Sequence, residues 1–190
     1  LPYRFAMVEL DKLVVYQRSL TKTWADDLAA RLGPAPDAAT VFAACQQLDT
    51  APPPLTVEAA GAARFVFSSP APHLTFHEAT LLTAGDLPGY RTFGPIAGVV
   101  GLVVGFRGNF LNVLAADGRM LLNNGYHRAY ALRALGLTHA PCVVQDVTRL
   151  DELRLLADDR VADDPAFYFR AKRPPLIKDF FDPQLAHLFA

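Results

Sequence analysis

The chain has 190 residues, a formal net charge of −1 and a hydrophobic content of 52%. This content is enough for a sizeable core and excludes global disorder, while the near-zero charge excludes a global basic field that would attract nucleic acid or an anionic membrane. No apolar run is long enough to span a bilayer and no signal peptide is recognisable, so we expect a soluble, cytoplasmic protein. Cys45 and Cys142 lack metal-ligand spacing, which predicts two buried thiols and no cysteine metal site.

The first elements are a strand and a short helix. Residues 5–15 alternate loosely and become β-branched toward their end, which predicts a strand or a strand pair. Thr23 is expected to cap the following helix, and Gly33 to end it. Trp24 is predicted to anchor this helix in the core.

A second helix is expected after the linker at residues 33–36. Asp37 can cap it. Its apolar stripe consists of Val41, Phe42, Cys45 and Leu48. Farther along, residues 64–67 read as a strand and residues 96–106 as a buried strand or a tightly packed helix, whereas residues 74–91 are ambiguous.

The last third of the chain gives clearer signals. Residues 111–114 and 120–122 are predicted to form a hairpin around the turn Asp117-Gly118. A helix follows over residues 125–135, with Gly136 as its stop, and residues 142–147 form the next strand. Residues 151–157 read as a short helix.

The junction between this hairpin and its helix is a natural anion site. It carries the sequence Asn-Asn-Gly-Tyr-His-Arg at residues 123–128, called the box below. The first N–H groups of a helix lack intrahelical partners and lie at the positive end of the helix dipole. Gly125 permits close approach of a phosphate to the backbone, and Arg128 can add a planar donor fork.

The order of hairpin, box, alanine-rich helix ending in Leu135-Gly136 and strand after Pro141 resembles the ParB/sulfiredoxin-like superfamily over residues 111–147. Members of that superfamily hold nucleotide phosphates at this box: sulfiredoxin binds ATP, ParB partition proteins bind CTP, and free-serine kinases transfer a phosphoryl group. The resemblance implies that Gly125, His127 and Arg128 contact phosphate, and that His127 could also transfer a proton.

The other box residues have two readings each. Asn123 and Asn124 either contact the ligand or satisfy backbone groups at the strand end. Tyr126 either stacks on a base or packs its ring in the core. Tyr126 also stands where sulfiredoxin has its cysteine, which rules out sulfiredoxin chemistry.

A kinase-like activity would need a carboxylate for Mg²⁺. The kinase-like relatives have an acidic residue where this chain has Asn124. Glu9 and Asp11, near the end of the first strand, are therefore the candidates for catalysis, with exposed strand-end charges as the alternative reading. No separate metal site is predicted.

The sequence thus predicts one α+β domain over residues 1–190, with a small mixed sheet and surrounding helices. It also predicts an Ala/Pro-rich insertion at residues 34–109 and an aromatic and basic tail at 163–190.

The leading hypothesis is a protein that binds a nucleotide (ATP or CTP) or another phosphorylated ligand. In its enzymatic form, this protein would be a Mg²⁺-dependent small-molecule phosphotransferase or nucleotidase. The alternative is a non-enzymatic, ligand-switched module that associates with DNA or a protein. No helix-turn-helix pattern follows residue 147, which disfavours DNA, although residues 170–173 either contact nucleic acid or form a solvated basic turn. The oligomeric state stays open.

Overall fold

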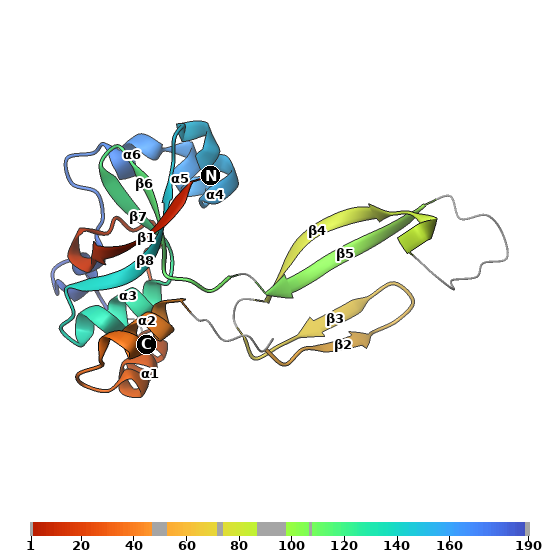
Figure 1. Cartoon of the computed structure of the whole chain (residues 1–190), viewed down its shortest axis with the longest axis horizontal. Helices are drawn as coiled ribbons and strands as arrows, with labels where there is room; N and C mark the ends of the chain where they lie inside the picture. The colour runs from red at the N-terminus through yellow and green to blue at the C-terminus, as the bar shows by residue number, and fades with distance from the viewer. Residues whose placement is uncertain (1, 47–52, 72–73, 87–97, 107, 189–190) are drawn as a thin grey trace. The chain divides into compact units, whose positions relative to one another are not determined.

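The computed structural model describes residues 2–46, 53–71, 74–86, 98–106 and 108–188. The chain divides into two compact units. The first unit joins residues 1–48 to residues 109–190, and the second comprises residues 49–108. Helices and a small mixed sheet together confirm an α+β protein (Figure 1).

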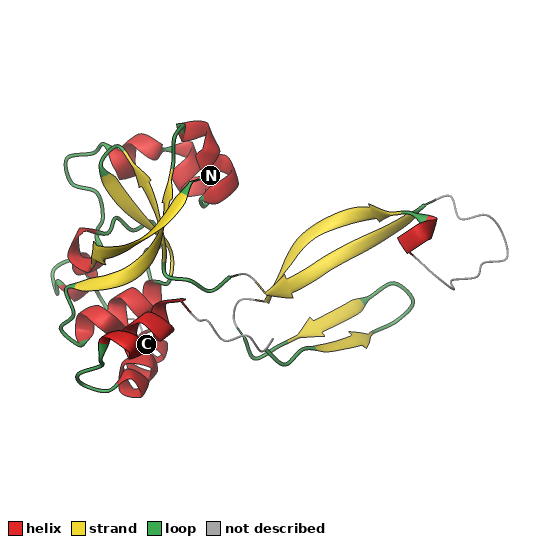
Figure 2. Cartoon of the chain, in the orientation of Figure 1, coloured by secondary structure: helices red, strands yellow, loops and turns green. Residues whose placement is uncertain are grey.

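The described sheet of the first unit has four strands in the order β1-β8-β6-β7. Figure 2 shows the strands in yellow and the helices in red. β1 pairs antiparallel with β8, β8 pairs parallel with β6, and β6 pairs antiparallel with β7. The strands are β1 (Tyr3–Glu9), β6 (Asn112–Ala116), β7 (Arg119–Asn124) and β8 (His139–Asp146). Val14 then bridges β7 at Leu121 and the C-terminal segment at Leu176.

The predicted hairpin is confirmed as β6 and β7. Asp117 and Gly118 form its two-residue turn with φ angles of 48° and 73°. Two successive positive φ values define the turn that matches the twist of paired strands, and Asp-Gly is a favoured sequence for it.

Two hydrophobic clusters lie on the two faces of this sheet. Side chains alternate along a strand, so Val113 and Leu122 enter one cluster while Leu114 and Leu121 enter the other. The first cluster packs against α2 (Ala38–Gln46) and α3 (Tyr126–Ala134), and α1 (Lys22–Leu32) packs on α3. The second packs against α4 (Leu153–Leu156), α5 (Asp159–Asp163) and α6 (Pro165–Phe169). The sheet is therefore covered by helices on both faces (Figure 1).

Short 3₁₀ segments complete the first unit. They are η1 (Leu10–Lys12), η3 (Leu150–Glu152) and η4 (Ile177–Phe181). The C-terminal tail is part of the core, because Phe169 and Ile177 are fully enclosed. Among the described helices, none has the length and apolar character needed to cross a membrane.

The second unit contains two antiparallel strand pairs. β2 (Thr56–Ala59) pairs with β3 (Phe65–Ser68), and β4 (Leu74–Leu82) pairs with β5 (Val99–Phe106). η2 (Ala84–Asp86) follows β4. The structure thus resolves the ambiguous residues 74–86 as strand and 3₁₀ helix, and residues 87–91 lie outside the described residues. Of residues 96–106, predicted as a buried strand or a packed helix, residues 96 and 97 lie outside the described residues and 99–106 form a strand. The prediction of burial was wrong, because Val100 and Leu102 are 66% and 58% exposed.

Several expectations for the N-terminal helices need correction. α1 begins at Lys22 after Thr21, and Thr23 lies inside it rather than capping it. Trp24 is 56% exposed, so it is not a core anchor. The separate unit begins at residue 49 rather than 34, because α2 buries Val41 and Cys45 in the core of the first unit.

Other expectations for this region are confirmed. Asp37 accepts a hydrogen bond from the N–H of Thr40 at 2.8 Å and caps α2. Gly33 has a φ of 78° at the end of α1. Both cysteines are free and buried. Of the predicted stripe on α2, however, Phe42 is 41% exposed, and Leu48 lies outside the described residues.

Candidate functional site

The box lies where β7 gives way to α3. Gly125 is the residue before the helix and has a left-handed backbone, with φ 100° and ψ 30°. A Cβ atom there would come within 2.6 Å of Leu111 Cδ1 and 3.2 Å of Arg128 Nη2. The position therefore requires glycine both for its φ and for the close approach of two side chains.

Two helix N-termini meet at His127. The N–H of Thr21, the residue before α1, donates to His127 Nε2 at 3.1 Å. His127 itself lies in the first turn of α3, and its ring centroid is 5.4 Å from that of Trp24 in the first turn of α1. The starts of α1 and α3 are therefore neighbours.

Neither of these helix starts is capped. No side chain accepts a hydrogen bond at Thr21 or Gly125, and neither first turn carries an acidic residue. The first N–H groups of both helices thus lack a carboxylate or hydroxyl partner within the described chain. Two positive dipole ends lie next to each other without a compensating negative charge.

His127 is held in its neutral form. A backbone N–H can only donate, so Nε2 must be unprotonated to accept the bond from Thr21. Burial lowers the pKa of the His127 imidazole below its ordinary value. Both effects favour the uncharged ring in the folded protein.

This arrangement predicts acid sensitivity. Because the pKa of His127 is lowered by folding, the unfolded chain takes up a proton first as the pH falls below about 6.5. We expect the free energy of unfolding to decline from that pH and to level off below the folded-state pKa. His127→Gln retains an acceptor for Thr21 without titrating, so urea titrations at about pH 8 and about pH 5 should show a smaller decline in the variant. Equal declines would contradict the assignment.

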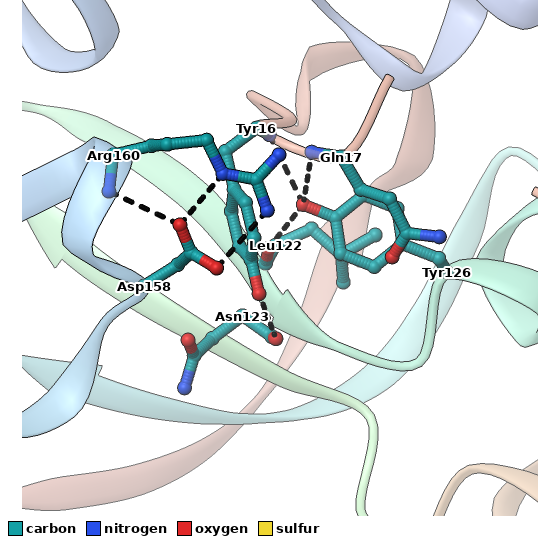
Figure 3. Close-up of polar contacts among 7 residues, drawn as sticks. All are labelled: Tyr16, Gln17, Leu122, Asn123, Tyr126, Asp158 and Arg160. Atoms are coloured by element: carbon teal, nitrogen blue, oxygen red, sulfur yellow. Dashed lines mark hydrogen bonds and ion pairs between the residues drawn. The ribbon is translucent and has the colours of Figure 1, made fainter. Parts of the chain in front are cut away.

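Tyr126 is buried, and its hydroxyl has hydrogen-bond partners, which supports the reading in which its ring packs in the core. Its hydroxyl accepts hydrogen bonds from the N–H groups of Tyr16 at 3.1 Å and Gln17 at 3.3 Å, and donates to the carbonyl of Leu122 at 2.9 Å (Figure 3). Burial raises the pKa of this phenol, which keeps the hydroxyl a donor at every physiological pH. The hydroxyl thereby fixes the backbone at the start of the segment that leads to α1.

Tyr16 extends this network to β7 and to α5, near the C-terminal part of the chain. Its hydroxyl donates to the carbonyl of Asn123 at 3.4 Å. The guanidinium of Arg160 lies 5.3 Å from the Tyr16 ring centroid and is itself paired with Asp158 at 2.7 Å (Figure 3). The segment before α1 is thus fastened to both β7 and α5.

Arg128 is buried, and its guanidinium donates hydrogen bonds to protein oxygens. It is 6% exposed, and its Nη1 donates to the carbonyls of Ala44, at 3.3 Å, and Cys45, at 3.2 Å. The same nitrogen donates to the carbonyl of Asn109, whose Oδ1 accepts from Nη2 at 2.9 Å. The guanidinium therefore compensates the negative dipole end at the C-terminus of α2. It also joins α2 to Asn109, the first residue of the second stretch of the first unit. Its predicted phosphate contact stays a prediction, and we leave Arg128 out of the anion site proposed below.

The amide nitrogens of Asn123 and Asn124 have structural partners. Asn123 Nδ2 donates to Asn112 Oδ1 at 3.0 Å, and Asn124 Nδ2 donates to the carbonyl of Phe110 at 3.0 Å. Asn112 in turn donates to Gln145 Oε1 at 3.1 Å. These bonds support the reading in which the asparagines organise the strand ends.

The structure does not bring Glu9 or Asp11 to the box. Asp11 pairs with Arg133 at 2.7 Å, and Arg133 lies in the last turn of α3, whereas the box lies at the first turn. Glu9 pairs with Lys12 at 2.8 Å and lies opposite His139 in the sheet. Within the described ranges, no group of three or more His, Cys, Asp or Glu side chains could hold a metal ion.

The two arginines of residues 170–173 are paired within the first unit. Arg170 contacts Asp117 at 2.6 Å, and Arg173 contacts Asp179 at 2.6 Å. These pairs fasten the tail to the hairpin turn and to η4. Contact of this segment with nucleic acid stays a prediction.

Thr21 and Trp24 are the site residues that the sequence did not reveal. Trp24 was expected inside the core, and the position of α1 beside the box depends on contacts between residues about 100 positions apart in sequence. Comparisons of the chain with protein-family models, with curated proteins and with solved structures gave no match.

Proposed function

We propose that this protein binds a phosphorylated small molecule of the nucleotide class where α1 and α3 begin. The observation that carries the proposal is the meeting of two uncapped helix N-termini at His127. A phosphate there would accept hydrogen bonds from the unpartnered N–H groups and would neutralise two dipole ends at once.

The surroundings favour a ligand with an aromatic part. Trp24 is 56% exposed and its ring lies beside His127. An exposed indole offers a stacking surface for a base, and stacking tolerates any base because every base has a π-face. The resemblance of residues 111–147 to the ParB/sulfiredoxin-like superfamily supports ATP or CTP as the ligand.

The placement of the carboxylates favours a binding module over a phosphotransferase. A Mg²⁺-dependent transfer needs carboxylate ligands close to the phosphates. Glu9 and Asp11 instead form ion pairs with Lys12 and Arg133, away from the first turn of α3. We therefore infer that a bound nucleotide acts here as a ligand whose binding orders α1 against α3.

Thr23→Glu provides a direct test, because it should change stability and binding in opposite directions. Thr23 is exposed in the first turn of α1, where a carboxylate interacts favourably with the helix dipole by about 0.3–1 kcal/mol. The same charge repels a phosphate at that helix end. We expect unchanged or higher thermal stability together with about tenfold weaker binding of ATP or CTP, a loss of ~1.4 kcal/mol, measured by calorimetry with and without Mg²⁺.

The matched control adds the same charge elsewhere. Leu155→Glu places a carboxylate on α4 at a position that is 88% exposed and lies on the other face of the sheet. Its nucleotide affinity should equal that of the wild type. The proposal fails if the wild type binds neither nucleotide nor inorganic phosphate, or if both variants bind equally well. Turnover of a bound nucleotide in Mg²⁺ would favour the phosphotransferase.

A further inference from the structure

β1 is an edge strand with an unpaired side. It pairs only with β8 in the described sheet. The N–H of Leu10 donates to the carbonyl of Thr138, and the N–H of Asp146 donates to the carbonyl of Pro2. In an antiparallel pair, hydrogen-bonded positions alternate, so the even-numbered residues of β1 face β8. The backbone groups of Tyr3, Phe5, Met7 and Glu9 therefore point to the open edge.

The side chains at the same positions form an exposed apolar row. Tyr3, Phe5 and Met7 are 69%, 64% and 61% exposed, whereas Val8 is enclosed in the core. Natural edge strands are usually protected by charges, prolines or bulges, because an unpaired edge is a template for another strand. Between Phe5 and Val8, this strand carries none of these protections.

We propose that β1 pairs with β1 of a second copy of this chain, antiparallel and about a two-fold axis, joining two four-stranded sheets into one of eight strands. The sequence of β1 matches itself in one register that uses all seven residues. Ala6 then lies opposite Ala6 of the second copy, Phe5 lies opposite Met7 of the second copy, and Tyr3 lies opposite Glu9 of the second copy.

This register agrees with the backbone geometry. In this register, every hydrogen-bonded pair between the copies joins two odd-numbered residues. These are the residues whose N–H and C=O groups face the open edge, and together they give about eight hydrogen bonds between the copies. It also puts the smallest side chain of the strand on the axis. Registers centred on Phe5 or Met7 pair only five residues, and the register centred on Arg4 places two arginines opposite each other.

The apolar row becomes continuous in such a dimer. Phe5 and Met7 of each copy would meet on one face, and aromatic and apolar cross-strand pairs of this kind stabilise sheets. Arg4 does not oppose a like charge, and it is already paired with Asp146 at 3.4 Å. A two-fold contact of this type closes on itself, so it gives a dimer and not a fibre.

Phe5→Pro tests the proposal on the whole chain by sedimentation over a wide range of concentration. The substitution removes an N–H that faces the open edge and leaves the bonds to β8, and proline is accepted at such edge positions. The wild type should be a dimer, and the variant should dissociate at least about tenfold more readily, with an unchanged circular dichroism spectrum.

A charge pair provides a second test that does not depend on proline. Phe5→Lys and Met7→Glu should each weaken the dimer, and the double variant should restore it, because the new lysine of one copy lies opposite the new glutamate of the other. Leu81→Lys, at an exposed position of β4 in the second unit, is the control and should leave the dimer intact. A monomeric wild type overturns the proposal, as does a dimer that Leu81→Lys disrupts and Phe5→Pro leaves intact.

Discussion

Replacing Arg128 by methionine is expected to lower the free energy of unfolding of the first unit by about 2–4 kcal/mol. The guanidinium provides hydrogen bonds to the carbonyls of Ala44, Cys45 and Asn109, and to the side chain of Asn109. Methionine fills a similar volume but donates none of these bonds. Buried carbonyls at the end of α2 would then lose their partners, and the attachment of α2 to the core would weaken.

The measurement is a urea titration followed by tryptophan fluorescence. Trp24 is the single tryptophan and lies in the same unit as Arg128, so its signal reports this unit. Arg133→Met is the matched control, on the same helix, and removes a half-exposed pair with Asp11 that should contribute about 0–1 kcal/mol. Equal effects of the two substitutions would show that the Arg128 bonds contribute little.

The result for Arg128 separates a structural arginine from a ligand-binding one. If Arg128 contacted phosphate, Arg128→Met would reduce nucleotide affinity with little change in stability. In the structure its fork is directed at backbone oxygens, so we expect the loss to appear in folding first. The sequence could not distinguish these cases, because an arginine in the first turn of a helix suits an anion and a neighbouring helix C-terminus equally well.

The local signals of the last third of the chain were sufficient to predict its elements. The Asp117-Gly118 turn, the glycine before α3 and Gly136 after it each require a positive φ, and all four residues have one. Such positions can be predicted from the sequence because few residues other than glycine, asparagine and aspartate adopt a positive φ. The hairpin, α3 and β8 follow from them with boundaries shifted by one to three residues.

The parts that could not be predicted depend on distant contacts. α2 falls within the insertion predicted at residues 34–109, yet its residues Val41 and Cys45 belong to the same core cluster as Ala129 and Leu132 of α3. Likewise, nothing near Thr21 in the sequence indicates that its N–H meets His127. The sequence therefore predicts one part of the candidate site, the box at the start of α3. It does not predict the other part, the start of α1 beside it.

Gly125→Ala should be the most damaging single-methyl change in the box, with an expected loss of about 2–4 kcal/mol. The first contribution is the left-handed backbone, with φ 100°, which an L side chain rarely adopts. The second is steric, because the new methyl group would lie 2.6 Å from Leu111 Cδ1, and Leu111 is fully enclosed in the core and cannot move aside.

Gly118→Ala isolates the backbone contribution. Gly118 also has a positive φ, 73°, but no atom lies within 4 Å of the position of its missing Cβ. Its substitution should therefore cost only the backbone strain, about 1 kcal/mol, and urea titrations of the two variants give the packing contribution by difference. The new methyl group at Gly125 would also press on Arg128, 3.2 Å away at Nη2, so the variant should also weaken the docking of α2. If the two variants lose equal stability, the close packing around Gly125 contributes nothing, and glycine is required at this position only for its φ angle.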